Sequence, residues 1–252
     1  MSVNKNYRNN IEIDHNRLQP VLKLVISGHV FEWYEFEISP RIPERKNEKR
    51  NIKTREQRLA EYMKSEDRQK NYSKTKKQIE RLIYCNLKLT KFLTLTFAGE
   101  MSQIEIANVH FHNFVARLRR LYPEFQYIAV PEFQKRGAVH YHLLCYLPYV
   151  PGEIIAKVWT HGFIKIKRTD RVKNLAKYMT KYLTKDLFDG RLYSKKKFFC
   201  SRELDRPQVL YDEDALHKIC TETGLTMLYE NEFPASYFGT IKYVLYEKDR
   251  PI

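Results

Sequence analysis

The stretch Pro131-Glu-Phe-Gln-Lys-Arg-Gly-Ala-Val-His-Tyr-His142 joins two runs of β-forming residues, 125–133 and 138–147. The four residues 134–137 between them end in a glycine, so the two runs are predicted to form an antiparallel hairpin. A turn centred on residue 136 pairs Glu132 with His140. Because side chains alternate along a strand, the imidazoles of His140 and His142 then leave the same face, about 7 Å apart, beside the Glu132 carboxylate.

These three side chains predict an open metal site. Two neutral imidazole nitrogens and one carboxylate leave positions for water and a substrate phosphate oxygen, which suits Mg²⁺ or Mn²⁺. A cupin would place its glutamate shortly after the second histidine, and a non-haem iron oxygenase uses a different order of ligands. A closed zinc site would need a fourth ligand, and Cys145 lies on the opposite strand face from His142.

The chain repeats the HxH spelling at His110-Phe-His112, on a predicted helix. Residues two apart on a helix point in directions about 200° apart. We therefore expect His110 and His112 to be surface and helix-packing residues that do not share a metal.

A second candidate for chemistry is a pair of tyrosines on a helix predicted over residues 170–185. Tyr178 and Tyr182 are four residues apart and share one helix face, with Lys181 and Lys185 on the same side. The neighbouring stripe is apolar, which predicts that it docks on the sheet and directs the phenols outward: Val172, Leu175, Ala176, Met179 and Leu183. A phenol is a poor nucleophile at neutral pH unless cations stabilise the phenolate and the electrophile is activated. In that context it can displace the 3′ oxygen of a phosphodiester, which leaves a 5′-phosphotyrosine and a free 3′-OH.

The charge of the chain indicates a polyanionic partner. Its 252 residues include 45 Lys and Arg against 30 Asp and Glu, a formal net charge of +15. Residues 41–91 carry 17 basic and 7 acidic side chains and residues 165–197 carry 12 and 3, so the remainder is mildly acidic. Two basic zones on such a chain suit a groove or arm that follows nucleic-acid phosphates. The polar helical stretch 54–82 is expected to be either a mobile arm ordered by DNA or a solvated helix.

Composition also argues against several classes of protein. No apolar run reaches the length of a membrane span and the first ten residues are polar, so neither a membrane protein nor a secreted one is expected. The four cysteines include no CxxC pair, which favours a reduced, cytoplasmic protein. No GxxxxGK followed by Ser or Thr occurs, so strand separation would need a partner helicase.

The remaining patterns complete an α+β outline. A hairpin is predicted from runs 21–26 and 30–38 around Ser27-Gly-His29, and residues 91–97 alternate as a strand. Ser102 and Glu105 form a predicted capping box for a helix whose apolar face comprises Ile106, Val109, Phe114, Leu118 and Leu121. A short helix (152–159), a strand (163–167) and late strands near residues 237–246 follow.

Three segments, in this order, resemble motifs of the HUH endonucleases that initiate rolling-circle replication, especially phage and plasmid replication-associated proteins with two tyrosines. Phe92-Leu-Thr-Leu-Thr-Phe97 resembles the first strand motif, residues 131–142 the metal motif, and Tyr178-Met-Thr-Lys-Tyr182 the two-tyrosine motif. Trp159-Thr-His-Gly162, and Ser201-Arg202 with Arg206-Pro207, resemble accessory segments. The resemblance covers about residues 88–207.

The resemblance implies a palm with a central antiparallel β-sheet, ferredoxin/RRM-like, and flanking helices. It implies a Mg²⁺ or Mn²⁺ site at Glu132, His140 and His142. Tyr178 and Tyr182 would then alternate as nucleophiles, one nicking the origin and the other cutting the regenerated origin, with Lys181 and Lys185 positioning or neutralising phosphates. The residues expected at the DNA are Thr94, Thr96, Arg136, Lys177 and Lys185, although the two threonines also simply suit a strand. His161 is next to Gly162 in a predicted loop, which favours a turn over a fourth ligand.

The expected function is therefore site-specific nicking and rejoining of single-stranded DNA at a replication origin, with a host helicase and DNA polymerase as further partners and no membrane. The expected organisation is an N-terminal hairpin and basic helical arm (1–87) and an endonuclease domain (88–252) whose sheet the C-terminal strands complete or extend. Two alternatives remain open. One is a rolling-circle transposase or conjugative relaxase with the same chemistry, and the other is a non-catalytic basic nucleic-acid-binding domain.

Overall fold

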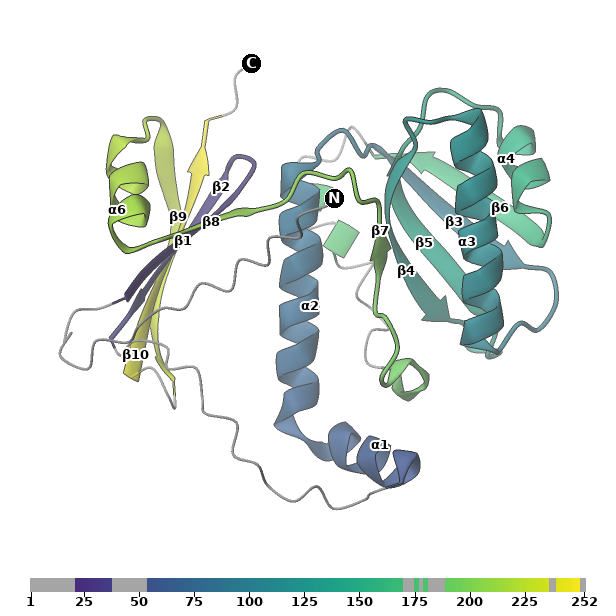
Figure 1. Cartoon of the computed structure of the whole chain (residues 1–252), viewed down its shortest axis with the longest axis horizontal. Coiled ribbons are helices and arrows are strands. Elements are labelled where there is room, and N and C mark those ends of the chain that lie inside the picture. The colour runs from purple at the N-terminus through teal and green to yellow at the C-terminus, as the bar shows by residue number, and fades with distance from the viewer. Residues whose placement is uncertain are drawn as a thin grey trace, which may run out of the picture. The chain divides into compact units, whose positions relative to one another are not determined.

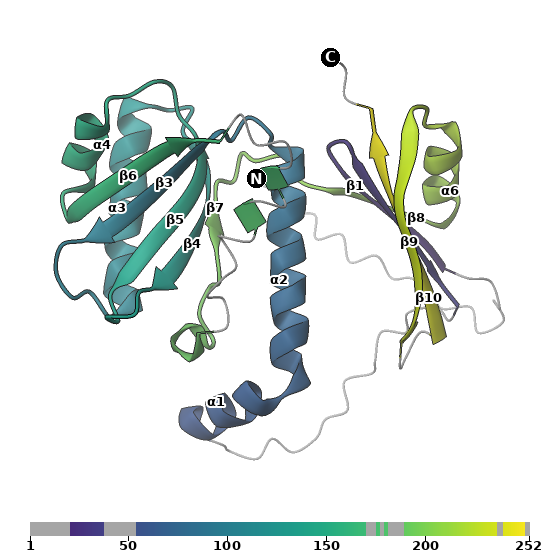
Figure 2. The same ribbon diagram turned by 180° about the vertical axis from the view of Figure 1, so that it is seen from behind.

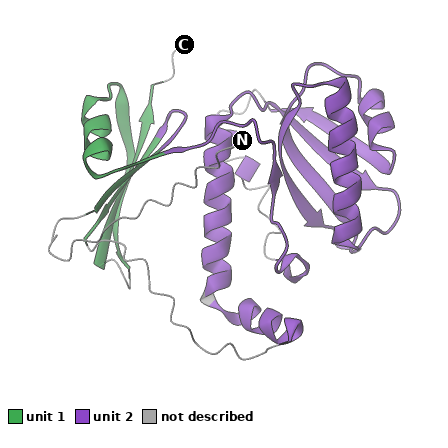
Figure 3. Ribbon diagram, viewed as in Figure 1, with its two compact units in different colours: residues 1–25, 31–45, 209–252 green, residues 26–30, 46–208 purple. Residues whose placement is uncertain are grey.

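The structure is a computed structural model that describes residues 21–37, 54–169, 175–176, 179–180, 189–235 and 239–249. The chain divides into two compact units, one of residues 1–25, 31–45 and 209–252 and the other of residues 26–30 and 46–208 (Figure 3). The strands form two antiparallel five-stranded sheets with flanking helices. The predicted α+β class is confirmed.

The first sheet has the strand order β8-β1-β2-β10-β9. Its elements are β1 (Val21–Ser27), β2 (Val30–Phe36), β8 (Gln208–Tyr211), α6 (Asp212–Thr221), β9 (Leu225–Ala235) and β10 (Gly239–Lys248). The hairpin predicted at the N-terminus is thus present. The C-terminal strands do not complete the sheet that contains residues 91–97, contrary to the prediction: β10 pairs with β9 along its length and neighbours β2. The periodicity of a strand predicts which face it buries but not which distant strand it pairs with.

The second sheet, in the other unit, has the strand order β6-β3-β5-β4-β7. Its strands are β3 (Lys91–Phe97), β4 (Gln126–Phe133), β5 (Val139–Tyr146), β6 (Gly162–Arg168) and β7 (Phe199–Cys200). Two helices, α3 (Ile104–Leu121) and α4 (Gly152–Trp159), cover one face of it (Figure 1). Leu93, Leu95, Tyr141 and Leu143 are fully buried on this helix-covered face, in the main core of the unit.

Two further helices precede the second sheet in sequence, α1 (Arg55–Lys64) and α2 (Glu66–Cys85). Thr54 caps α1 through a capping box with Gln57. The end of α2 is not an arm, because Ile79, Leu82 and Ile83 are buried in a cluster with sheet residues. Both of our expectations for residues 54–82 are therefore wrong for this end of the stretch, which belongs to the core of the second unit.

Helix α3 begins later than the sequence predicted. Its N-cap is Gln103, with no side-chain hydrogen bond to the helix, so the predicted capping box at Ser102 is wrong. Glu105 pairs with Lys195 instead. Lysine gives this carboxylate a charged partner, which a backbone amide at the helix start does not.

The apolar face of α3 also differs from the predicted one. Phe114 and Leu118 are buried as expected, whereas Ile106, Val109 and Leu121 are exposed. The buried residues are Ile104, Ala107, Phe111, Phe114, Val115 and Leu118. This phase buries the ring of Phe111, which has a larger apolar area than the aliphatic side chains it leaves in solvent.

All four cysteines are free, as the absence of a CxxC pair led us to expect. None of the helices in the described part of the chain has the length and apolar character needed to cross a membrane.

Gly162 is required where β6 begins. Its φ is +151°, and a Cβ there would lie 2.4 Å from the backbone nitrogen of Ala98 and 2.4 Å from the carbonyl oxygen of Thr96. We expect Gly162→Ala to lower the free energy of unfolding by about 3 kcal/mol, measured by urea denaturation of the full chain. Gly99 is the matched control, because a Cβ there meets no atom within 4 Å. Equal losses in the two variants would contradict this account of the β3–β6 junction.

Candidate functional site

The strand registers bring the predicted metal ligands to one face of the second sheet. Glu132 on β4 is paired with His140 on β5, as predicted from the hairpin. On the other side of β5, Thr96 is paired with His140 and Thr94 with His142. These five side chains therefore share a face, called here the histidine face, which lies opposite the helix-covered face. Figure 2 shows the sheet from this side, with α3 behind the strands.

His142 is held by three neighbours on this face. Its Nε2 contacts Oε2 of Glu132, and its Nδ1 lies 3.1 Å from the hydroxyl oxygen of Thr94. Its ring also stacks on Phe92, with centroids 5.6 Å apart and planes 5° from parallel. The orientation of this imidazole is thus fixed by two hydrogen-bond partners and one aromatic ring.

The partners of His142 also select its tautomer. A carboxylate accepts hydrogen bonds, so a neutral ring carries its proton on Nε2, and Thr94 donates to Nδ1. When Nε2 gives its lone pair to a cation, the proton resides on Nδ1, and the same hydroxyl accepts it. Because a hydroxyl is both donor and acceptor, Thr94 can support His142 in either state.

His140 has a different environment. Its Nε2 is buried and has no hydrogen-bond partner among the described residues. Burial, reinforced by the nearby His142, lowers the pKa of His140 to about 4, although the Glu132 carboxylate opposes this shift. A neutral imidazole with a free lone pair is the form that binds a metal. A buried polar atom without a partner is costly, and ligand binding relieves that cost.

The chemistry of these three residues fits a divalent cation. Two imidazoles and one carboxylate are suitable ligands, and the Nε2 of His140 has no competing partner in the described part of the chain. The ring centroids of His140 and His142 are 6.2 Å apart. As placed, however, no three His, Cys, Asp or Glu side chains of the described ranges form a group that could hold a metal. The carboxylate contacts the nitrogen that would be a ligand, so metal binding at Glu132, His140 and His142 stays a prediction.

The two predicted nucleophiles, Tyr178 and Tyr182, lie outside the described residues, as do Lys177, Lys181 and Lys185. Three residues of the predicted docking stripe are described, and all three are buried: Leu175, Ala176 and Met179. They form one cluster with Ile128, Val130 and Leu144, which project from β4 and β5 on the histidine face. The prediction that this stripe docks on the sheet is confirmed for these positions, whereas Val172 and Leu183 lie outside the described ranges.

Arg136 and Thr96, both predicted to contact DNA, have local roles in the structure. The guanidinium of Arg136 donates to the side-chain oxygen of Gln134 at 2.8 Å and to the carbonyl oxygen of Phe97 at 3.1 Å. It therefore links the β4–β5 turn to the end of β3. The carbonyl oxygen of Thr96 accepts a hydrogen bond from the indole of Trp159 at 3.0 Å, and its side chain lies on the histidine face.

The other histidines are structural, as predicted. His110 packs against His161, with ring centroids 4.1 Å apart, in an aromatic cluster that includes Phe97. His112 meets Phe199 edge-on instead, so the two histidines of the helical HxH contact different neighbours. The carbonyl of His161 accepts from the backbone nitrogen of Ala98, which supports the expected turn role.

Buried tyrosines in this unit do not suit nucleophilic chemistry. Burial raises the pKa of Tyr127 to about 12 and raises the pKa of Tyr141 further above its usual range. The phenol of Tyr141 donates to Asn108 at 2.7 Å on the helix-covered face. Both phenols stay protonated at neutral pH, away from the histidines.

The accessory segment around Ser201 and Arg206 ties the unit together. The hydroxyl of Ser201 accepts from the backbone nitrogen of Tyr127 and from Arg119, each at 3.0 Å. Asn86, at the end of α2, exchanges hydrogen bonds with the backbone of Asp205. These contacts are structural, and they place this segment beside β4 and α2.

Sequence reasoning missed three residues of the histidine face. On β6, Phe163 is paired with Thr96, Lys165 with Thr94, and Lys167 with Phe92. The alternation of Gly162-Phe-Ile-Lys-Ile-Lys-Arg168 carries the signal, because Ile164 and Ile166 pack against the core and the intervening side chains face the other way.

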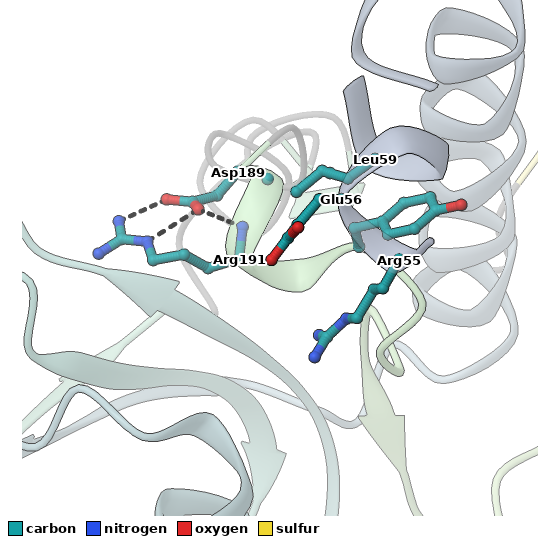
Figure 4. Close-up of a pocket in the computed structure, with 7 residues that line it drawn as sticks. Arg55, Glu56, Leu59, Asp189 and Arg191 are labelled. Carbon is teal, nitrogen blue, oxygen red and sulfur yellow. Dashed lines mark hydrogen bonds and ion pairs between the residues drawn. The ribbon is translucent and has the colours of Figure 1, made fainter. Parts of the chain in front are cut away.

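A pocket of about 510 Å³ lies elsewhere in the second unit, between α1 and the 3₁₀ turn Gly190–Leu192 (Figure 4). Arg55, Glu56 and Leu59 line one side, and Asp189 and Arg191 form an ion pair on the other. It contains none of the predicted site residues. The pairing of Asp189 with Arg191 satisfies both charges, so the pocket does not compete with the histidine face as a candidate site.

Residues 90–187 match the family model of the replication-associated protein ORF2. The matched segment includes β3 to β6 and both candidate tyrosines, so it contains every residue predicted for the site. The match supports a family of replication initiators, and with it a role at DNA. Comparisons with curated proteins and with solved structures found no significant match.

The contact between Thr94 and His142 can be tested with a matched pair of variants. Thr94→Val removes the hydroxyl at Nδ1, so the ring nitrogen shifts of His142 should change in a metal-free ¹⁵N spectrum, with a stability loss of about 1 kcal/mol. Thr96→Val is the control, since it makes the same change on the same strand and face opposite His140. A His142 spectrum that responds equally to both variants would refute the role of Thr94.

Proposed function

We propose that this chain initiates rolling-circle replication by nicking and rejoining single-stranded DNA at an origin through a phosphotyrosine intermediate. The observation that carries the proposal is the histidine face. It places Glu132, His140 and His142 on adjacent strands of an α+β unit, within the segment that matches replication-associated proteins. The alternative of a non-catalytic binding domain gives no reason for an imidazole nitrogen that is buried without a partner among the described residues.

Glu132, His140 and His142 are proposed to hold Mg²⁺ or Mn²⁺. Such an ion, when bound, supplies positive charge that polarises a non-bridging phosphate oxygen. His140 is prepared for this role because its low pKa keeps the ring neutral at physiological pH. Thr94 and Phe92 keep the plane of the His142 ring fixed while its Nε2 changes partner.

Tyr178 and Tyr182 are the proposed nucleophiles. The phenol gives up its proton to solvent, and its oxygen attacks phosphorus in line with the 3′ oxygen. A bond forms between the tyrosine oxygen and phosphorus, the bond from phosphorus to O3′ breaks, and O3′ takes a proton. Lys181 and Lys185 would lower the cost of the phenolate through their positive charge. Attack by a 3′-OH on the phosphotyrosine reverses these steps and rejoins the strand.

The proposed product determines the partners. The free 3′-OH is a primer for a host DNA polymerase, while the 5′ end stays attached to the protein. The sequence contains no nucleoside-triphosphate motif of the P-loop type, so we propose that a host helicase separates the strands.

The covalent step predicts a specific loss on mutation. Incubation with an origin oligonucleotide and Mn²⁺ should give a protein–DNA adduct on a denaturing gel, and EDTA should prevent it. The double variant Tyr178→Phe/Tyr182→Phe should form none, whereas each single variant retains some. Tyr149→Phe is the control, because Tyr149 is 90% exposed and lies outside the site. An adduct in the double variant would exclude these nucleophiles.

Metal binding can be measured without activity. Free Mn²⁺ gives a strong electron paramagnetic resonance signal that weakens on binding, so titration reports the affinity directly. We expect His140→Ala/His142→Ala to lose at least about tenfold in affinity. The same change at the helical pair, His110→Ala/His112→Ala, should leave binding intact. If both double variants bind equally, the site is not on the histidine face.

A further inference from the structure

Strand β6 is an outer strand of the second sheet, and its two faces differ in character. Ile164 and Ile166 pack against the main core. On the histidine face the same strand carries Phe163, Lys165 and Lys167, all exposed. The strand therefore presents one aromatic ring and two ammonium groups in a row beside the threonines of β3.

These three side chains are available to a ligand. Phe163 is 69% exposed, the highest fraction of any phenylalanine among the large exposed hydrophobic residues. Lys165 and Lys167 form no ion pair with any described residue. Their paired neighbours on β3 are Thr94 and Phe92, which carry no charge to offset them. An exposed ring next to accessible cations is the combination that single-stranded nucleic acid recognises.

We propose that Phe163, Lys165 and Lys167 bind single-stranded DNA, with a base stacked on the Phe163 ring and successive phosphates on the two lysines. The proposal deepens the proposed function, on which it rests for the statement that the bound strand is the one to be cut. Lys165 and Lys167 are two residues apart, about 6.7 Å along the strand, which is comparable to the separation of neighbouring phosphates in an extended chain.

The same geometry favours a single strand over a duplex. In a duplex each base is covered by its neighbours, so a protein ring cannot stack on it without unstacking the helix. The row also lies two strands from His140, about 10 Å across the sheet. One short piece of DNA can thus reach both β6 and the histidines.

The test is binding of a fluorescent oligonucleotide, followed by anisotropy in EDTA so that no cutting occurs. Phe163→Leu keeps the apolar character but removes the aromatic face, and should weaken binding about tenfold. Phe163→Trp should restore the affinity, and the emission of the new tryptophan should be quenched by DNA. Equal affinities for the leucine and tryptophan variants would overturn the stacking role.

The lysines are tested by salt dependence. Lys165→Gln/Lys167→Gln should lower the slope of log affinity against log salt by about 1.4, since each phosphate contact to a single strand contributes about 0.7. Lys157→Gln is the control, because Lys157 is exposed on α4, on the helix-covered side. An unchanged slope in the double variant would overturn the proposal, as would tighter binding of duplex DNA or of RNA of the same sequence.

Binding and adduct formation fail independently. If the β6 variants bind as the wild type does but the adduct still forms with Mn²⁺, the β6 proposal is wrong and the nicking function stands. If the variants lose binding as expected but the wild type never forms an adduct, the β6 proposal stands and the nicking function is wrong.

Discussion

The chemistry of the second unit depends on the register of β3 between β5 and β6. Thr94 has His142 on one side and Lys165 on the other, so a single strand aligns the candidate metal ligands with the cationic row. Because side chains alternate, a slip of one residue would turn these groups toward α3 and place Leu93 and Leu95 in solvent. The large apolar area buried under α3 and α4 therefore fixes the register, and the polar face follows from it.

The histidine face itself is graded across the sheet. Towards β4 and β7 it is apolar, and the end of α2 packs there together with Leu175, Ala176 and Met179. Towards β6 it becomes polar and exposed, ending with Phe163 and its lysines. His140 and His142 lie between these two environments. This position explains why His140 is buried enough to be neutral while His142 keeps a carboxylate and a hydroxyl as partners.

Local patterns predicted the parts of the fold that are close in sequence. The β4–β5 hairpin, and with it the pairing of Glu132 with His140, follows from a short turn and strict alternation. The helix at residues 152–159 was predicted with its observed ends. The phase of α3 was not, because it depends on which side chains fill the space above Tyr141, and Phe111 stacks there with ring centroids 4.5 Å apart.

Long-range choices were beyond the sequence patterns. The alternating strands near the C-terminus gave no sign that β10 would lie beside β2, since either sheet offers an edge to an amphipathic strand. The charge of residues 54–82 suggested an arm, whereas three apolar residues at the end of α2 were enough to anchor it. For the candidate site, residue types and alternation predicted which side chains share a face. They did not predict that Glu132 would contact His142 diagonally while its direct partner is His140.

The diagonal contact has a consequence for how the site would change state. With Glu132 on the Nε2 of His142, the carboxylate and one imidazole satisfy each other's hydrogen-bonding needs, and the Nε2 of His140 is left without a partner among the described residues. A cation would compete with the Glu132 hydrogen bond for the same nitrogen, and it would gain the His140 nitrogen at no such cost. Phe92 and Thr94 hold the His142 ring in place throughout, because a stacking ring and a hydroxyl are indifferent to which atom Nε2 faces. The side chain that must move is therefore Glu132, and the two histidines form the fixed part of the site.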